Sequence, residues 1–258
     1  MTRWARALAL GALALCAERV RADQIPIKAE ANPAAKAGDA DAPWDPIEGF
    51  NRKMFWFNEQ LDRWVMSPAA KGWDWVAPDA VQRSVSRLFD NSQLPVVFVN
   101  DLLQGKPKAA AVDAGRFLTN TTIGLAGLLD PASEWGLADH DEDFGQTLAV
   151  WGAGPGPYLV VPVWGPSNIR DGAGALADNA WVWFVPVWYA TTAARTGWAV
   201  NDRSLVLREV DEARKASLDF YAAVRDAYAQ RRRRLIADET DTKVHDEEDL
   251  YFPIGDMD

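Results

Sequence analysis

Residues able to carry acid–base or metal chemistry gather in one short stretch, "ADHDEDFGQ". Residues 139–143 of this stretch are Asp-His-Asp-Glu-Asp, and the only histidines of the chain are His140 and His245. Such side chains can ligate a cation, but consecutive residues of a loop rarely converge on one ion. No glycine stands where a calcium-binding loop needs one. A solvated acidic loop is the favoured interpretation, and a metal site is the alternative.

Nucleophiles and cofactor motifs do not occur in a recognisable setting. The single cysteine, Cys16, lies in the N-terminal leader, and Ser133 and Ser167 lack a G-x-S-x-G context. The glycines of residues 152–156 are not followed by the Lys-Ser/Thr of a phosphate loop, and their spacing differs from a dinucleotide fingerprint. We therefore expect no enzyme activity, no cofactor and no metal site.

Residues 1–22 have the character of an export signal, with a positively charged start and a short apolar run over 7–15. The sequence "LALC" (13–16) resembles a bacterial lipobox, which would make Cys16 the site of a lipid anchor. Leu15, however, stands where the processing peptidase prefers a small residue. Cleavage after Ala22 and an uncleaved anchor are the alternatives.

The body of the chain is expected to be an all-α domain over residues 44–237. A linker rich in Ala, Pro, Asp and Lys precedes it over 23–43, and an acidic tail over 238–258 is expected to be disordered. Apolar spacings of three and four predict helices, with Pro68 as an interruption. Their ranges are 46–66, 69–76, 79–89, 96–103, 108–118 and 204–235. The only strand signal is 158–163, which Pro162 weakens.

The charge distribution argues against a nucleic-acid partner. The net charge is −10, and the one basic cluster is Arg231–Arg234. This cluster lies at an expected helix C-terminus, where positive charge complements the helix dipole. Contact with anionic lipid headgroups is the alternative interpretation of the cluster.

Two apolar segments are unusual for a water-soluble domain. Residues 144–169 carry no charge and include the run "WGAGPGPYLVVPVWGP" (151–166), and residues 180–194 are also uncharged. Neither is an uninterrupted apolar helix long enough to cross a bilayer. Tryptophan is enriched where lipid meets water, so we expect membrane-interface positions at Trp151, Trp164, Trp181, Trp183 and Trp188.

Several long blocks of the sequence resemble the MlaA/VacJ family of phospholipid-transport proteins of Gram-negative bacteria. They are "DPIEGFNRKMFWFNEQLD" (45–62), "VNDLLQGKPKAAAVDAGRFLTNTTIGLAGLLDPASEWGL" (99–137), "DEDFGQTLAVWGAGPGPYLVVPVWGPSNIRD" (141–171) and "YAAVRDAYAQRRR" (221–233). The blocks occur in the family's order and cover nearly all of 44–235.

The resemblance implies an all-α, ring-shaped lipoprotein in the periplasmic leaflet of the outer membrane, with a central amphipathic channel. It implies that mislocalised phospholipids leave the outer leaflet through this channel and pass to a soluble periplasmic lipid-binding carrier. Trimeric porins are the implied partners in the membrane. The family's glycine-rich channel hairpin, or gate, maps onto Gly152, Gly154, Pro155, Gly156, Pro157 and Tyr158. Its first-helix signature maps onto Gly49, Phe50, Asn51 and Arg52.

Some roles stay open at the level of sequence. Asn51 and Arg52 are interpreted either as channel-facing groups or as a structural cap and ion pair. Arg116, Asn120 and the Arg170–Asp171 pair are interpreted as internal polar fasteners, with headgroup contact as the alternative. For the whole chain, a non-transporting scaffold that binds porins or lipid carriers is the alternative to a conduit.

Overall fold

The computed structural model describes residues 43–180 and 188–238, and these are mostly helical, which confirms the expected class. The first part contains helices α2 (Glu48–Leu61), α3 (Ser67–Val76), α4 (Asp79–Gln104), α5 (Pro107–Thr122), α6 (Pro131–Glu134), α7 (Phe144–Val150) and α8 (Ile169–Asp178). The second contains α9 (Trp188–Leu205), α10 (Leu207–Ala216) and α11 (Phe220–Ile236). The leader, all of the linker except Pro43, and all of the acidic tail except Asp238 lie outside the described residues.

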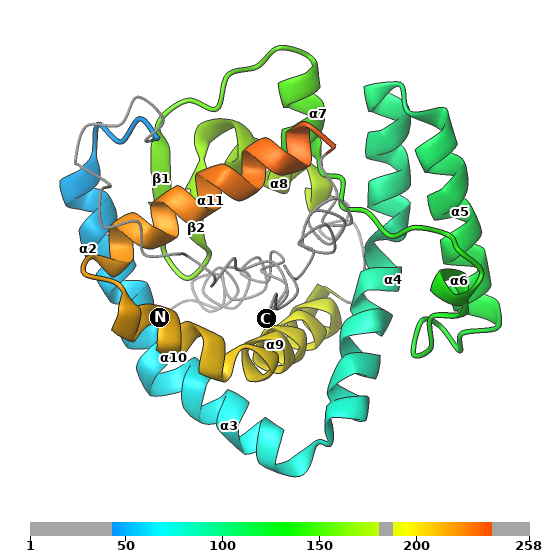
Figure 1. Ribbon diagram of the computed structural model, residues 1–258, viewed down its shortest axis with the longest axis horizontal. Coiled ribbons are helices and arrows are strands. Elements are labelled where there is room, and N and C mark those ends of the chain that lie inside the picture. Colours follow the sequence, from blue (N-terminus) through cyan, green and yellow to red (C-terminus); the bar gives the residue numbers. More distant parts are fainter. Residues whose placement is uncertain (1–42, 181–187, 239–258) are drawn as a thin grey trace, which may run out of the picture.

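The elements follow one another around a ring (Figure 1). α2, α3 and α4 form consecutive sides, and α5 and α6 pack outside α4. α7 and α8 form the next side, with the strands β1 (Tyr158–Val161) and β2 (Gly165–Asn168). β1 packs back against α2 and closes the ring, and α11 crosses from the α2 side to α7.

Side-chain amides make the closure specific. Asn51 of α2 donates to the carbonyl of Tyr158 (3.0 Å) and accepts from the backbone N–H of Val160 (2.9 Å). Asn58, seven residues later, makes the same kind of paired contact with Val161 and Val163. The helix therefore satisfies backbone groups on the exposed edge of β1, which would otherwise need water or another strand.

The first helical stretch runs on without the break expected at Pro68. A five-residue π turn, Asp62–Met66, connects α2 to α3, and Pro68 occupies the first turn of α3. The π turn shifts the hydrogen-bond spacing where proline has no N–H to donate, so the chain stays helical. α4 likewise spans 26 residues through Pro95, where two separate helices had been predicted.

The helix predicted over 204–235 is wrong as a single element. α9 ends at Leu205, and α10 ends before Ser217, whose backbone is extended. The side chain of Asp219 then accepts a hydrogen bond from the N–H of Ala222 and starts α11. Local capping by aspartate therefore overrides the apolar periodicity.

A β hairpin follows the glycine-rich segment that the resemblance assigns to the channel. β1 and β2 pair antiparallel, with Tyr158 opposite Asn168 and Val161 opposite Gly165, so the turn is 162–164. The glycine-rich residues 152–157 are the irregular segment that leads into β1. In Figure 1 this segment follows the outer edge of the ring, and the β1–β2 turn points towards its middle. Pro162 ends β1, as its missing N–H requires.

Burial in the described residues is inverted relative to an ordinary soluble domain. Seventeen polar or charged residues are buried, against twelve hydrophobic ones, five of which are alanine. Large apolar side chains face outward, including Phe50 and Phe57 on α2. Trp64 and Trp75 are 74% and 88% exposed. Exposed apolar surface on this scale marks contact with a membrane or another protein.

None of the described helices combines the length and the apolar character that crossing a membrane requires.

Candidate functional site

A cavity of about 160 Å³ lies among α4, α7, α8, α9, α11 and the β hairpin. One part of its wall is apolar, with Val96 and Val97 of α4 and Trp198 of α9. The other part is charged, and its cations are Arg195, Arg231 and Arg232. The cavity is therefore amphipathic, and it is lined by the elements that make the inner wall of the ring.

Arg232 of α11 is the centre of a buried network beside this cavity. Its guanidinium donates to both carboxylate oxygens of Asp143 and to Asp171 Oδ1 (3.1 Å). Asp171 also accepts from the hydroxyl of Tyr228 (2.6 Å) and from Nε of its neighbour Arg170 (2.8 Å). The network joins α7, α8 and α11 through charge-assisted hydrogen bonds.

The network sets the charge state of its acids. Burial alone would raise the pKa of Asp143, but the charge of Arg232 and its hydrogen bonds hold that pKa below the ordinary value. Burial raises the pKa of Asp178 to about 6, even though it accepts hydrogen bonds from the Phe144 N–H (2.8 Å) and Asn100 Nδ2 (3.0 Å). The cavity wall therefore includes Asp143, a carboxylate held ionised by arginine, and Asp178, a carboxyl with a pKa of about 6.

Glycines allow α7 and α8 to approach closely enough for this network to form. A Cβ on Gly174 would lie 2.3 Å from the backbone nitrogen of Gly145. A Cβ on Gly145 would lie 2.8 Å from Asp171 Oδ1 and 3.0 Å from Arg232 Nη2. Only glycine fits at these two positions.

In the glycine-rich segment before β1, the C-terminal end is constrained by contact with α8. Gly152 and Gly156 adopt positive φ angles of 93° and 68°, and a Cβ on Gly156 would lie 3.2 Å from the Ile169 Cβ. Gly154 has no heavy atom near its missing Cβ. Residues 152–156 are exposed, and Tyr158 is buried at 1% exposure. Pro155 is tied to α8 because its carbonyl accepts from the Arg170 N–H (3.2 Å).

The first-helix signature divides between structural contacts and exposed surface. Asn51 is fully buried in the closure of the ring. Arg52 pairs with Glu48 and Asp219, so it links α2 to the start of α11. Gly49 and Phe50 lie on the exposed face. Arg52 therefore forms the ion pairs of the structural interpretation, but no side chain caps the start of α2, and Asn51 bonds to β1 instead.

The tryptophans predicted at a membrane interface are described in part. Trp151 is 57% exposed and donates its indole N–H to the carbonyl of Leu103 (3.1 Å). Trp164 lies in the β turn and lines the cavity. Trp188 begins α9. Trp181 and Trp183 lie outside the described residues.

The residues interpreted as polar fasteners make structural contacts. Arg116 is 4% exposed and pairs with Asp130 (3.2 Å) and Asp139 (3.4 Å). Asn120 donates to Asp130 (2.8 Å) and accepts from the Ala132 N–H. These bonds hold the loop after α5 against the helix.

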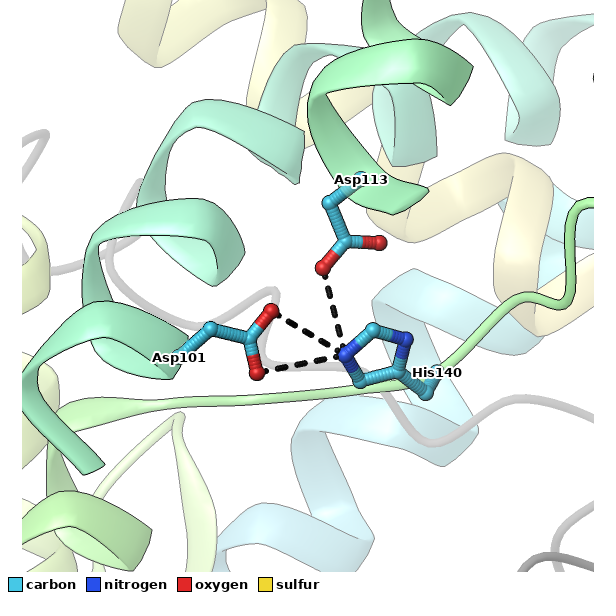
Figure 2. Close-up of side chains that lie close together, drawn as sticks. All are labelled: Asp101, Asp113 and His140. Atoms are coloured by element: carbon cyan, nitrogen blue, oxygen red, sulfur yellow. Dashed lines mark hydrogen bonds and ion pairs between the residues drawn. The ribbon is translucent and has the colours of Figure 1, made fainter. Parts of the chain in front are cut away.

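The solvated acidic loop predicted over 139–143 is wrong. Glu142 is 6% exposed and pairs with Lys106 (2.8 Å), and Asp143 caps α7. His140 lies between Asp101 and Asp113 (Figure 2). The partners come from α4, α5 and α11, far away in the sequence, which is why the local pattern did not reveal them.

The fold and its burial define an all-α ring with an apolar outer surface and a polar interior. The family model described as MlaA lipoprotein matches residues 43–235, and the chain belongs to this family.

Similar proteins agree with this assignment. The chain is 35% identical over 192 residues to the intermembrane phospholipid transport system lipoprotein MlaA of Haemophilus influenzae, covering 72% of this chain and 76% of the relative. It is 34% identical over 210 residues to the protein of the same name in Escherichia coli, covering 77% and 80%. An uncharacterized protein of Rickettsia prowazekii is 38% identical over 189 residues, covering 71% and 74%.

A solved chain has the same architecture. It comes from work on the structural basis for maintenance of bacterial outer membrane lipid asymmetry. The TM-score is 0.67 at 32% identity, and the match covers 74% of this chain and 98% of the solved one.

Proposed function

We propose that this chain is a passive conduit that removes mislocalised phospholipids from the outer leaflet of the outer membrane. The observation that carries the proposal is the inverted burial: exposed aromatic side chains outside, and buried charged and amide side chains inside. An apolar exterior suits a ring immersed in one leaflet, and a polar interior suits the passage of headgroups.

The physical barrier to lipid movement supports this use of a polar interior. Moving a polar group through hydrocarbon without hydrogen-bond partners costs roughly 2–7 kcal/mol. A path lined by Arg195, Arg231 and carboxylates replaces water around the headgroup, and Val96, Val97 and Trp198 contact the acyl chains. Such a path lowers the barrier without an energy source, and it needs no reaction of the lipid, so we assign the chain no enzymatic step.

The names of the relatives support phospholipids as cargo and the outer membrane as location. The Haemophilus influenzae and Escherichia coli relatives are named components of an intermembrane phospholipid transport system. We propose the periplasmic side of the outer membrane as the location, trimeric porins as partners in the membrane, and a soluble periplasmic lipid-binding carrier as acceptor. The exposed apolar side chains of α2 and α3 offer surface for porin and lipid contact.

The lipid anchor is a separate part of the proposal, since Cys16 lies outside the described residues. If Cys16 is acylated, Cys16→Ser should stop maturation or release the chain from membranes. Intact-protein mass spectrometry of the mature chain measures this directly, and an N-terminus at Asp23 would refute acylation.

Deletion of the gene tests the transport role. The expected result is more phospholipid at the cell surface and greater sensitivity to detergent, and unchanged surface lipid would refute the proposal.

A non-transporting scaffold is the competing function. Gly154→Leu separates the two, because Gly154 is exposed and has space for a side chain, so the fold should tolerate the change. If the chain acts only as a scaffold, the Gly154→Leu variant should complement a deletion as well as the parent does. If the segment before β1 must move or lie beside the lipid path, transport should fall while the protein level is unchanged.

A further inference from the structure

Three potential ligand side chains from three separate elements meet outside the cavity (Figure 2). Asp101 lies near the end of α4, Asp113 lies in α5, and His140 lies in the loop before α7. Their ligand atoms all lie within 4.8 Å of one another. Asp101 and Asp113 are fully buried, and the His140 side chain is 20% exposed.

Neighbouring ion pairs hold the loop so that His140 faces the two carboxylates. Arg116, one turn after Asp113 on α5, pairs with Asp139 on one side of the histidine (3.4 Å). Lys106, at the junction of α4 and α5, pairs with Glu142 on the other side (2.8 Å). The position of the imidazole is therefore fixed from both directions by residues outside the cluster.

The distances from His140 Nε2 to the carboxylate oxygens are longer than those of a charge-assisted hydrogen bond. His140 Nε2 lies 3.3 Å and 3.2 Å from the two oxygens of Asp101 and 3.2 Å from Asp113 Oδ2. A charged N–H donor to a carboxylate gives about 2.7–2.9 Å, and one nitrogen has one proton for these three oxygens. Ligands at about 2.0–2.1 Å from a shared tetrahedral ion are roughly 3.3 Å from each other.

Asp113 is the second observation that points to a ligand. Neither of its oxygens receives a hydrogen bond, although the side chain is fully buried, and its charged contact is the 3.2 Å ion pair of Oδ2 with His140 Nε2. An ionised carboxylate in this position costs free energy unless a positive charge compensates it.

We propose that Asp101, Asp113 and His140 bind one Zn²⁺ ion. Imidazole nitrogen and aspartate oxygen are both zinc ligands. A divalent cation would also neutralise the two buried carboxylates. The ion would join α4, α5 and the loop before α7, so its role is to stabilise this outer part of the ring. The expectation of no metal site came from residues 139–143 alone, and two of the three ligands lie outside that stretch.

Zinc binding to the full chain tests the proposal. The protein is purified in detergent with a tag that contains no histidine, treated with EDTA and dialysed against Zn²⁺, and bound zinc is measured by mass spectrometry. Asp113→Asn and His140→Gln remove one ligand each. His245→Gln is the matched control, because it removes the only other imidazole of the chain.

The expected result is one zinc ion per chain and a rise in Tm on adding Zn²⁺, both retained in His245→Gln and lost in the other two variants. Asp113→Asn keeps the side-chain shape, so metal-free Asp113→Asn should melt no lower than the metal-free parent and remains informative if His140→Gln does not fold. Zinc binding equal to the parent in Asp113→Asn or His140→Gln would overturn the proposal. The absence of saturable binding by the parent would also overturn it.

Discussion

Arg232→Met is the substitution that tests the buried network most sharply. The change keeps much of the side-chain length and removes the charge that Asp143 and Asp171 share. Asp171 would keep its bonds from Tyr228 and Arg170, but Asp143 would keep no charged partner of this network and would depend on Gln146 at the start of α7. The loss should therefore fall mainly on Asp143.

The size of the expected loss depends on how far water reaches the Arg232–Asp143 ion pair. Removing one partner of a buried ion pair costs about 3–5 kcal/mol. The side chain of Asp143 is 34% exposed, so water screens part of the uncompensated charge. We expect a loss of about 2–3 kcal/mol, which for a domain of this size lowers Tm by about 5–10 °C.

Thermal unfolding followed by circular dichroism in detergent measures this loss. Arg233→Met is the matched control, since Arg233 follows Arg232 on α11 and is exposed, and its effect should stay within about 0.5 kcal/mol. Adding Asp143→Asn to Arg232→Met should recover most of the loss, because asparagine still caps α7 without the charge. An Arg232→Met variant as stable as Arg233→Met, or a double variant less stable than Arg232→Met, would refute the reasoning.

Three further substitutions probe the packing and the charge of the same region. Gly174→Ala places a Cβ against the backbone of α7 and should lower the free energy of unfolding by about 3 kcal/mol or more. Gly172→Ala on the same helix is the control, because its Cβ meets only Ser167 Oγ at 3.6 Å. Urea unfolding measures both variants, and equal stability would contradict the close approach of α7 and α8. Asp178 has a folded-state pKa of about 6, above the ordinary 3.8, so the folded chain holds this proton more tightly and the resulting stability is lost as the pH rises through 6. The unfolding free energy of the parent relative to Asp178→Asn should therefore fall by about 1 kcal/mol between pH 5 and 7.5, and a flat difference would contradict the raised pKa. Gly156→Ala should lower the unfolding free energy by about 1 kcal/mol because of the positive φ, whereas Gly154→Ala should change it by less than about 0.5 kcal/mol; equal effects in thermal melts would contradict the backbone assignment.

Sequence periodicity predicted the helical class and helical structure over most of α2 to α5, because apolar spacing and local signals coincide there. It did not predict α6, α7, α8 or α9. Periodicity did not predict which side of each helix is buried. The apolar spacing over 46–66 includes Phe50 and Phe57 on one side of the helix, but periodicity cannot tell whether that side meets a core or the outside of the ring. Asn51, about 100° around the helix from Phe50, is the buried residue because it bonds to β1.

The candidate site could be predicted only where its partners are close in sequence. Arg170 and Asp171 are adjacent, and the sequence indicated this pair as an internal polar contact, whereas Asp143 was expected to lie in a solvated loop. Arg232 joins them from 61 and 89 residues away. Only the closure of the ring brings these residues together, and the same is true of His140 with the helices α4 and α5.

Surface phospholipid is the measurement that tests the conduit most directly. The gene is deleted and the strain is complemented with the parent, with Val96→Trp or with Val99→Trp. Val96→Trp places a large ring in the cavity, whereas Val99 is exposed on the outer face of the same helix. We expect the parent and Val99→Trp to restore a low level of outer-leaflet phospholipid, and Val96→Trp to leave it high while remaining folded and membrane-bound. Full restoration by a folded Val96→Trp would contradict passage of lipid beside this cavity, and a deletion that leaves surface phospholipid unchanged would contradict the transport role itself.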